Sequence, residues 1–248
     1  MRALLWTATA VALVALPGAP GAQSSDALPM ALEQMLAAAR ALTPPPGERR
    51  EPRVGDVAAS GDLGYLTGPR RLERDTGGTV HGVYLTIWKR ERDGRFGPVL
   101  DVTTPTPGAP SFPTGFTRAA PAGRFAEYDD TTPPLSAADS LLNAALRTDQ
   151  AKGYEPRLSG QVRLHRPGLT PLVGRTAILR WVAGQPAFEG ADTRYSEAAR
   201  SGDLGYTQGT YLHGRAGGGE RGTYVRLWIR ERGGQWVLAL DALQPDPA

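Results

Sequence analysis

The chain has 248 residues, 40% of them apolar, so it can bury a hydrophobic core, and its composition argues against a disordered or fibrous protein. Its 28 basic and 25 acidic side chains nearly cancel, which gives no electrostatic reason to expect nucleic acid or an anionic membrane as a partner. It has no cysteine, which excludes disulfides, thiolate metal sites and a cysteine nucleophile. The 31 glycines and 22 prolines indicate either a turn-rich fold or a long segment outside the folded core.

The first segment has the layout of a secretory signal peptide. Arg2 precedes an apolar run over 3–16, and Pro17, Gly18 and small residues follow up to Ala22. The run is too short to span a bilayer as a helix. We therefore expect a signal peptide over 1–22 and a periplasmic or secreted protein with no membrane contact after cleavage. A retained N-terminal anchor is the alternative.

The first half is predicted to be one helix followed by antiparallel strands. Residues 84–90 alternate with period two and are rich in aromatic and aliphatic side chains, as strands are. Asp93-Gly94 then forms a two-residue hairpin turn, and Ser60-Gly61-Asp62 reads as an earlier turn. The expected helix covers 31–42, and the expected strands include 53–59, 84–90 and 96–101. The Pro-rich stretch over 108–135 has no clear period and is predicted to be a linker laid over the surface.

The second half adds elements before the same pattern returns. Ser136 is a plausible N-cap of a helix ending at Gly153, with Asp139 in its first turn and with apolar positions at Leu141, Leu142, Ala145 and Leu146. A short strand pair over 157–166 and a second helix over 176–183 are expected next.

The two halves are copies of one unit. Ser-Gly-Asp-Leu-Gly-Tyr occurs at 60–65 and again at 201–206, and the strand at 84–92 is matched by 224–232. The first copy has no counterpart of the 136–153 helix or of the strand pair, so it is truncated. We divide the chain into a signal peptide, a truncated repeat over 23–107, a linker over 108–135 and a complete repeat over 136–248.

These motifs resemble the SnoaL-like group of the nuclear-transport-factor-2-like superfamily, in particular its domain of unknown function 4440. The resemblance rests on Val173-Gly174-Arg175, the repeated Ser-Gly-Asp-Leu-Gly-Tyr, Gly-Thr-Tyr-Val-Arg-Leu-Trp at 222–228 and the closing strand at 236–241. It implies an α+β cone, a curved antiparallel sheet wrapped around helices with a pocket at the open end, duplicated here in tandem with an incomplete first copy. The family contains isomerases, dehydratases, cyclases and proteins that only bind, so the fold does not give the function.

Two pairs of repeated aspartates could carry chemistry. Asp62 and Asp203 sit at exposed turns, where we expect them to accept local backbone N–H bonds. Asp101 and Asp241 end the last strand of each copy. There a carboxylate could act as a general base, but a strand-end aspartate bonded to the backbone or to an arginine is the favoured interpretation.

The paired strands separate an aliphatic face from an aromatic and cationic one. Tyr84 and Trp88, like Tyr224, Arg226 and Trp228, lie on the second face. That face either lines a ligand pocket or, the reading we favour, forms the surface by which the two repeats pair within the chain.

No converging acid–base set is evident. His165 is the best single candidate for acid–base work, although a surface histidine is the favoured interpretation. Three scattered histidines argue against a metal site, and no cofactor is expected. The leading hypothesis is an exported small-molecule-binding or structural protein without catalysis. The alternatives are an isomerase, dehydratase or hydrolase acting on a small apolar molecule in the 136–248 pocket, with His165 or Asp241 as base and Tyr206 or Tyr224 as donor, and a protein-interaction module.

Overall fold

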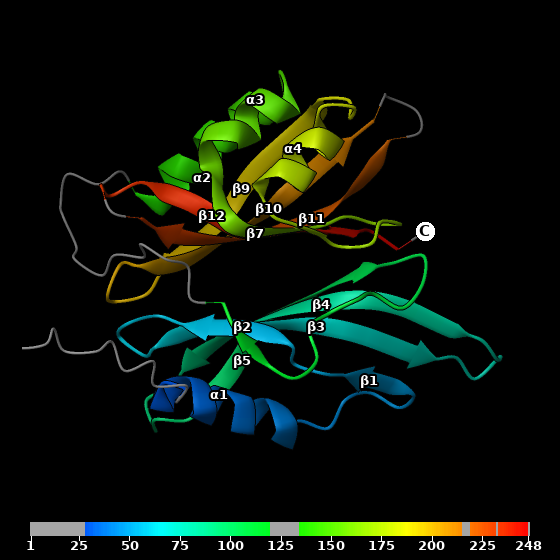
Figure 1. Ribbon diagram of the computed structural model, residues 1–248, viewed down its shortest axis with the longest axis vertical. Coiled ribbons are helices and arrows are strands. Elements are labelled where there is room, and N and C mark those ends of the chain that lie inside the picture. Colours follow the sequence, from blue (N-terminus) through cyan, green and yellow to red (C-terminus); the bar gives the residue numbers. More distant parts are fainter. Residues whose placement is uncertain (1–27, 120–133, 215–218, 232, 248) are drawn as a thin grey trace, which may run out of the picture.

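Two mostly antiparallel sheets packed face to face dominate the computed structural model, which describes residues 28–119, 134–214, 219–231 and 233–247. Helices cover the outer face of each sheet, so the sheets form the centre of the molecule (Figure 1). Within these ranges each sheet has six strands. The expected signal peptide over 1–22 lies outside the described residues. Among the described residues, no helix is long and apolar enough to cross a membrane.

The first sheet belongs to the first repeat and has the strand order β5-β4-β3-β2-β6, with β1 also paired to β3. Its elements are α1 (Met30–Ala41), β1 (Glu48–Arg50), β2 (Val54–Val57), β3 (Leu63–Glu73), β4 (Thr79–Arg90), β5 (Phe96–Pro105) and β6 (Thr117–Arg118).

The second sheet has the order β8-β7-β12-β11-β10-β9, in which β7 pairs in parallel with β12. Its elements are α2 (Leu135–Leu146), α3 (Gln150–Tyr154), the 3₁₀ turn η1 (Glu155–Arg157), β7 (Leu158–His165), β8 (Leu172–Val173), α4 (Arg175–Val182), β9 (Phe188–Ala198), β10 (Leu204–His213), β11 (Glu220–Arg230) and β12 (Trp236–Pro245).

The predicted α+β fold and the tandem duplication with an incomplete first copy are confirmed. Strands β2 to β5 and β9 to β12 follow the same antiparallel meander, and each closing hairpin has a register shift at the same place, after Ile87 in β4 and after Leu227 in β11. Helices α2 and α3 and strands β7 and β8 occur only in the second repeat.

Two boundaries differ from the sequence-based expectation. The helix expected to run from Ser136 to Gly153 begins at Leu135 and breaks after Leu146, because Asp149 caps a new helix by accepting a hydrogen bond from the backbone of Lys152. The expected linker also contributes structure, since β6 pairs in parallel with β2 and extends the first sheet. Residues 120–133 of the expected linker lie outside the described residues.

The aliphatic faces of the two sheets meet each other. One cluster contains Leu85 and Ile87 from β4 together with Val225, Leu227 and Ile229 from β11. Our expectation that the aromatic and cationic face joins the two repeats is therefore wrong. Contact between aliphatic faces needs no polar partner, whereas Arg226 on the opposite face needs carboxylates, which Asp139 of α2 and Asp241 of β12 supply within the same repeat.

The repeated Ser-Gly-Asp turns lock the two copies together by reciprocal bonds. Asp62 accepts from the backbone N–H of Arg200 at 3.2 Å, and Asp203 accepts from the N–H of Ala59 at 3.1 Å. The hydroxyls of Ser60 and Ser201 lie 2.9 Å apart, and each accepts the other's backbone N–H at 3.1 Å. These aspartates were expected at exposed tips accepting local bonds. They do accept local bonds, from the hydroxyls of Ser60 and Ser201 respectively, but each also binds the other copy, and Asp203 is buried.

Candidate functional site

The aromatic faces of both sheets lie beneath the helices, in the concave interior of each repeat. In the second repeat, Tyr224 and Trp228 pack in one cluster with Leu142 and Leu146 of α2. In the first, Tyr84 and Trp88 pack with Leu32, Met35 and Leu36 of α1. Because α2 and α3 have no counterpart among the described residues of the first repeat, the two interiors differ.

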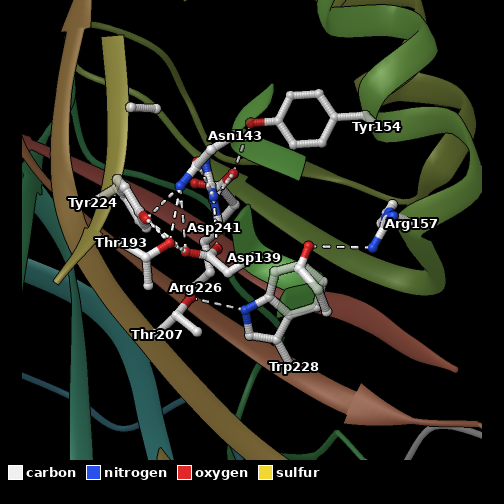
Figure 2. Close-up of polar contacts among 12 residues, drawn as sticks. Asp139, Asn143, Tyr154, Arg157, Thr193, Thr207, Tyr224, Arg226, Trp228 and Asp241 are labelled. Carbon is white, nitrogen blue, oxygen red and sulfur yellow. Dashed lines mark hydrogen bonds and ion pairs between the residues drawn. The ribbon is translucent and has the colours of Figure 1, made fainter. Parts of the chain in front are cut away.

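A buried polar network fills the interior of the second repeat (Figure 2). Arg226 donates through Nη1 to Asp139 Oδ1 and Asn143 Oδ1, both at 2.7 Å. The Tyr224 hydroxyl and the Thr193 hydroxyl each donate to Asp139 Oδ2 at 2.6 Å. Asp139 and Asn143 are one helical turn apart, so α2 presents both to the same point on β11.

Asp241 extends this network on the other side of Arg226. It accepts from Arg226 Nε at 3.2 Å, from Arg166 Nη1 at 3.1 Å and from the Tyr154 hydroxyl at 2.7 Å. Burial raises the pKa of Asp241, but the charges of Arg166 and Arg226 and these hydrogen bonds lower it more, so the pKa is below its usual value. Burial likewise opposes the charge of Arg226, yet Asp139 and Asp241 raise its pKa above the usual value.

The network consists of groups whose charges and donors are satisfied by one another. Asp139 and Asp241 have no accessible surface, and Arg226 has 1%. Burial is the main cause that raises the pKa of Tyr224, and the adjacent Asp139 raises it further, so the phenol stays neutral and donates its hydrogen bond. A carboxylate held between two arginines is a poor general base, because ionisation is already favoured and the proton it would gain is weakly held.

The same positions in the first repeat form an open pocket of about 340 Å³. Thr86 stands where Arg226 stands in the second copy, and Asp101 stands where Asp241 stands. Asp101 accepts from Arg50 Nη1 and from the Thr86 hydroxyl, each at 2.6 Å and both at Oδ1, and 41% of its side chain remains exposed. A short side chain in place of an arginine, with the small Ala39 of α1 on the opposite wall, leaves room for a ligand.

Aromatic and ring-shaped side chains form the walls of this pocket. Tyr84 and Trp88 provide flat surfaces from β4, and the guanidinium of Arg50 lies 5.3 Å from the centre of the Tyr84 ring. The remaining walls, apart from Thr86 and Asp101, are Ala39, Leu42, Thr43, Leu66, Pro44, Pro45, Pro52 and Pro98. Apolar walls with a few polar groups at one end are typical of small-molecule sites.

Trp88 differs from its counterpart in one hydrogen bond. The indole N–H of Trp228 donates to the Thr207 hydroxyl at 2.9 Å. The residue equivalent to Thr207 in the first copy is Leu66, which has no acceptor, and the buried indole N–H of Trp88 has no hydrogen-bond partner among the described residues. The first repeat has thus lost polar groups that hold the second interior together.

The structure does not bring the sequence-predicted acid–base residues together. Asp241 faces the buried network, while the Tyr206 hydroxyl donates to Glu197 at 3.2 Å and its ring packs in the core between the sheets. His165 is fully buried, and neither ring nitrogen has a hydrogen-bond partner in the part of the chain that the structure describes. The favoured interpretation of His165 as a surface residue is therefore wrong. Burial, helped by the charges of Arg163 and Arg166, lowers its pKa to about 3, so the ring is neutral at pH 7.

Replacing His165 by leucine is expected to stabilise the protein. The change removes two buried polar atoms without partners, and we expect the free energy of unfolding to rise by about 1–3 kcal/mol. Because the folded-state pKa lies below the unfolded value of 6.5, wild type loses stability as the pH falls from 6.5 towards 3. Urea denaturation at several pH values should show the advantage of H165L growing as the pH falls.

His213 offers the matched control for that substitution. Its ring lies within hydrogen-bond distance of the Pro186 carbonyl, at 3.2 Å, so H213L removes a partnered group and should give no gain. Equal stability of H165L and wild type throughout this pH range would contradict the prediction.

Several residues of the network were not singled out from the sequence. Asp139 was assigned to helix capping, and Asn143, Tyr154 and Arg166 were not considered as site residues. The available signal was the pair Asp139 and Asn143, two polar side chains four residues apart beside the apolar stripe of α2. The buried face includes them, while Leu141, expected on that face, is 58% exposed.

Comparison with known proteins gives a likeness of fold. No protein-family model matches the chain, and no curated protein matches it. The similar solved structures include nuclear-transport-factor-2-like proteins, each covering about half of this chain. A candidate ketosteroid isomerase from Parabacteroides distasonis is 13% identical, with a TM-score of 0.41, over 48% of this chain and 94% of its own.

Two further structures are similar to the same extent. A candidate dehydratase of the NTF2-like family from Streptomyces avermitilis is 18% identical, with a TM-score of 0.38, over 45% of this chain and 93% of its own. An NTF2-like protein of unknown function from Shewanella oneidensis is 13% identical, with a TM-score of 0.36, over 44% of this chain and 93% of its own. Identities this low carry no function across. Within the described residues, no group of three or more histidines, aspartates and glutamates is placed to hold a metal ion.

Proposed function

We propose that this protein is an exported small-molecule-binding protein whose ligand occupies the pocket of the first, truncated repeat. The observation that carries the proposal is the difference between the two interiors. The second is filled by Asp139, Arg226 and Asp241, whereas the equivalent space in the first is an open pocket with aromatic walls. Export is supported by the layout of the first 22 residues.

In this proposal the complete repeat is the scaffold and the truncated repeat is the binding unit, which reverses the assignment favoured by the sequence. The two repeats act as a dimer within one chain, joined by the aliphatic core and the reciprocal turns. The ligand is small and largely apolar, because the pocket walls are mostly prolines, aromatic rings and leucines. An enzyme acting in the second repeat has less support, because Asp241 is held as an ion by two arginines.

A single substitution that introduces the arginine of the second repeat into the first is expected to fill the pocket. In T86R an arginine enters at the position of Arg226 and can pair with Asp101, as Arg226 pairs with Asp241. The neutral fluorescent probe N-phenyl-1-naphthylamine should bind wild type, and T86R should weaken binding at least about tenfold, because the arginine occupies the volume that the probe needs. Fluorescence titration with the folded proteins measures the affinity of wild type and of T86R for the probe.

T79R is the matched control, since it places the same side chain on the same strand at an exposed end of β4. It should bind the probe as wild type does. No binding by wild type, or equal binding by wild type and T86R, would refute the proposed site.

A further inference from the structure

A cation occupies the interior of the second repeat at the place that corresponds to the pocket (Figure 2). The guanidinium of Arg226 lies 4.1 Å from the centre of the Tyr224 ring and donates through Nε to Asp241 Oδ2 at 3.2 Å. The other carboxylate oxygen, Oδ1, accepts from a second arginine, Arg166, at 3.1 Å. Each oxygen of Asp241 therefore has a cationic partner, and one of the two cations also lies over a tyrosine ring.

The first repeat keeps the carboxylate and the ring but has one arginine on the carboxylate instead of two. Tyr84 and Asp101 hold the equivalent positions on β4 and β5, and both line the pocket. Asp101 Oδ1 accepts from Arg50 and from the Thr86 hydroxyl, whereas Oδ2 has no hydrogen-bond partner among the described residues. The Asp101 side chain is partly exposed, so a ligand in the pocket can reach it.

Arg50 is a wall of the pocket and does not take the place of the second cation. Its charge is shared between two carboxylates, since it donates to Asp101 and pairs with Glu48. Its guanidinium is 5.3 Å from the centre of the Tyr84 ring, and about 340 Å³ remains open beside it. Glu48 pairs in turn with Arg70 at 2.8 Å. Two carboxylates and two arginines cancel, so this group has no net charge that would repel a cation.

We propose that the ligand is an organic cation whose charged head takes the place that the Arg226 guanidinium has in the second repeat. The head, an ammonium or a guanidinium, donates to Asp101 Oδ2 and lies against the ring of Tyr84. The body of the ligand is flat and apolar, because Trp88, the leucines and the prolines form the other walls. This inference rests on the proposed function, since it concerns the same pocket.

Two probes of equal size that differ in charge test it. 1-Naphthylmethylamine carries an ammonium at neutral pH, and 1-naphthalenemethanol carries an uncharged hydroxyl at the same position. Wild type should bind the amine about tenfold more tightly than the alcohol, because a hydrogen bond between two charged groups is stronger than one with a neutral donor. In D101N the amine should bind no more tightly than the alcohol, because the amide keeps an acceptor oxygen but has no charge. Isothermal titration calorimetry measures the four affinities.

The control variant D93N removes a carboxylate at the hairpin between β4 and β5, outside the pocket lining, and should keep the preference for the amine. A second measurement needs wild type alone: added salt should weaken binding of the amine more than binding of the alcohol.

Equal affinity of wild type for the amine and the alcohol, or a preference that D101N retains, would overturn the inference and leave the pocket standing. An equal effect of salt on both probes would also overturn it. Failure of both naphthalene probes and of N-phenyl-1-naphthylamine to bind would refute the proposed function as well.

Discussion

Replacement of Arg226 by methionine is expected to lower the free energy of unfolding by about 3–5 kcal/mol. The substitution leaves Asp139 without its cation and Asp241 with one arginine instead of two, and neither carboxylate has any accessible surface through which water could compensate. Methionine has a similar length, so the loss measures the uncompensated charge more than a cavity. This is among the largest effects a single side chain can have in a domain of this size.

Thermal and urea denaturation measure the effect, and R95M is the matched control. Arg95 has a side chain that is 86% exposed and pairs with Asp93 at the surface, so its replacement should leave the stability nearly unchanged. A loss of less than about 1 kcal/mol in R226M would show that the network is not the structural centre of the second repeat.

A fragment containing only the second repeat, residues 134–248, is expected to self-associate or precipitate. Removing the first repeat exposes the aliphatic face that includes Val225, Leu227 and Ile229, which is buried in the full chain. An apolar face of this kind is not stable in water and needs a partner. Because the two repeats are copies, a second fragment can take the place of the missing one. Sedimentation or size-exclusion chromatography with light scattering measures the association state.

L227D made within the fragment identifies the surface responsible. An aspartate at the centre of that face should shift the fragment towards monomer, whereas R221D, at an exposed position on the same strand, should not. A soluble, monomeric fragment 134–248 without substitutions would contradict the view that the first repeat is required as a pairing partner.

The turns and strands of both repeats could be predicted because their signals are local. Asp93-Gly94 and Gly233-Gly234 specify tight hairpins, and the alternation in 84–90 and 224–230 specifies strands. The repeated Ser-Gly-Asp motif showed the duplication, and its glycines, Gly61 and Gly202, take the same positive φ of 66° and 64°. The bonds that the aspartates of this motif make to the other copy were not predictable, since those donors lie about 140 residues away.

The site was harder to predict than the fold. Tyr84, Trp88, Tyr224, Arg226 and Trp228 were placed correctly on one face, but the function of that face was not. Period-two alternation tells which side chains share a face and says nothing about what covers it. We expected the aromatic face to form the contact between the repeats, but in both repeats it lies under the helices.

The sequence alone determined the α+β class, the duplication, the truncation of the first copy and the strand pairs, because each depends on spacing along the chain. Only the tertiary structure decided that the complete repeat is filled and that the truncated one is open. The difference arises where α2 places Asp139 against Arg226, while in the first repeat α1 contributes Ala39, which carries no charge, to the pocket beside Thr86. A charge can be buried only where folding brings partners from distant parts of the chain, as it brings Asp139 to Arg226. The residues next to Arg226 or Thr86 in the sequence do not reveal such partners.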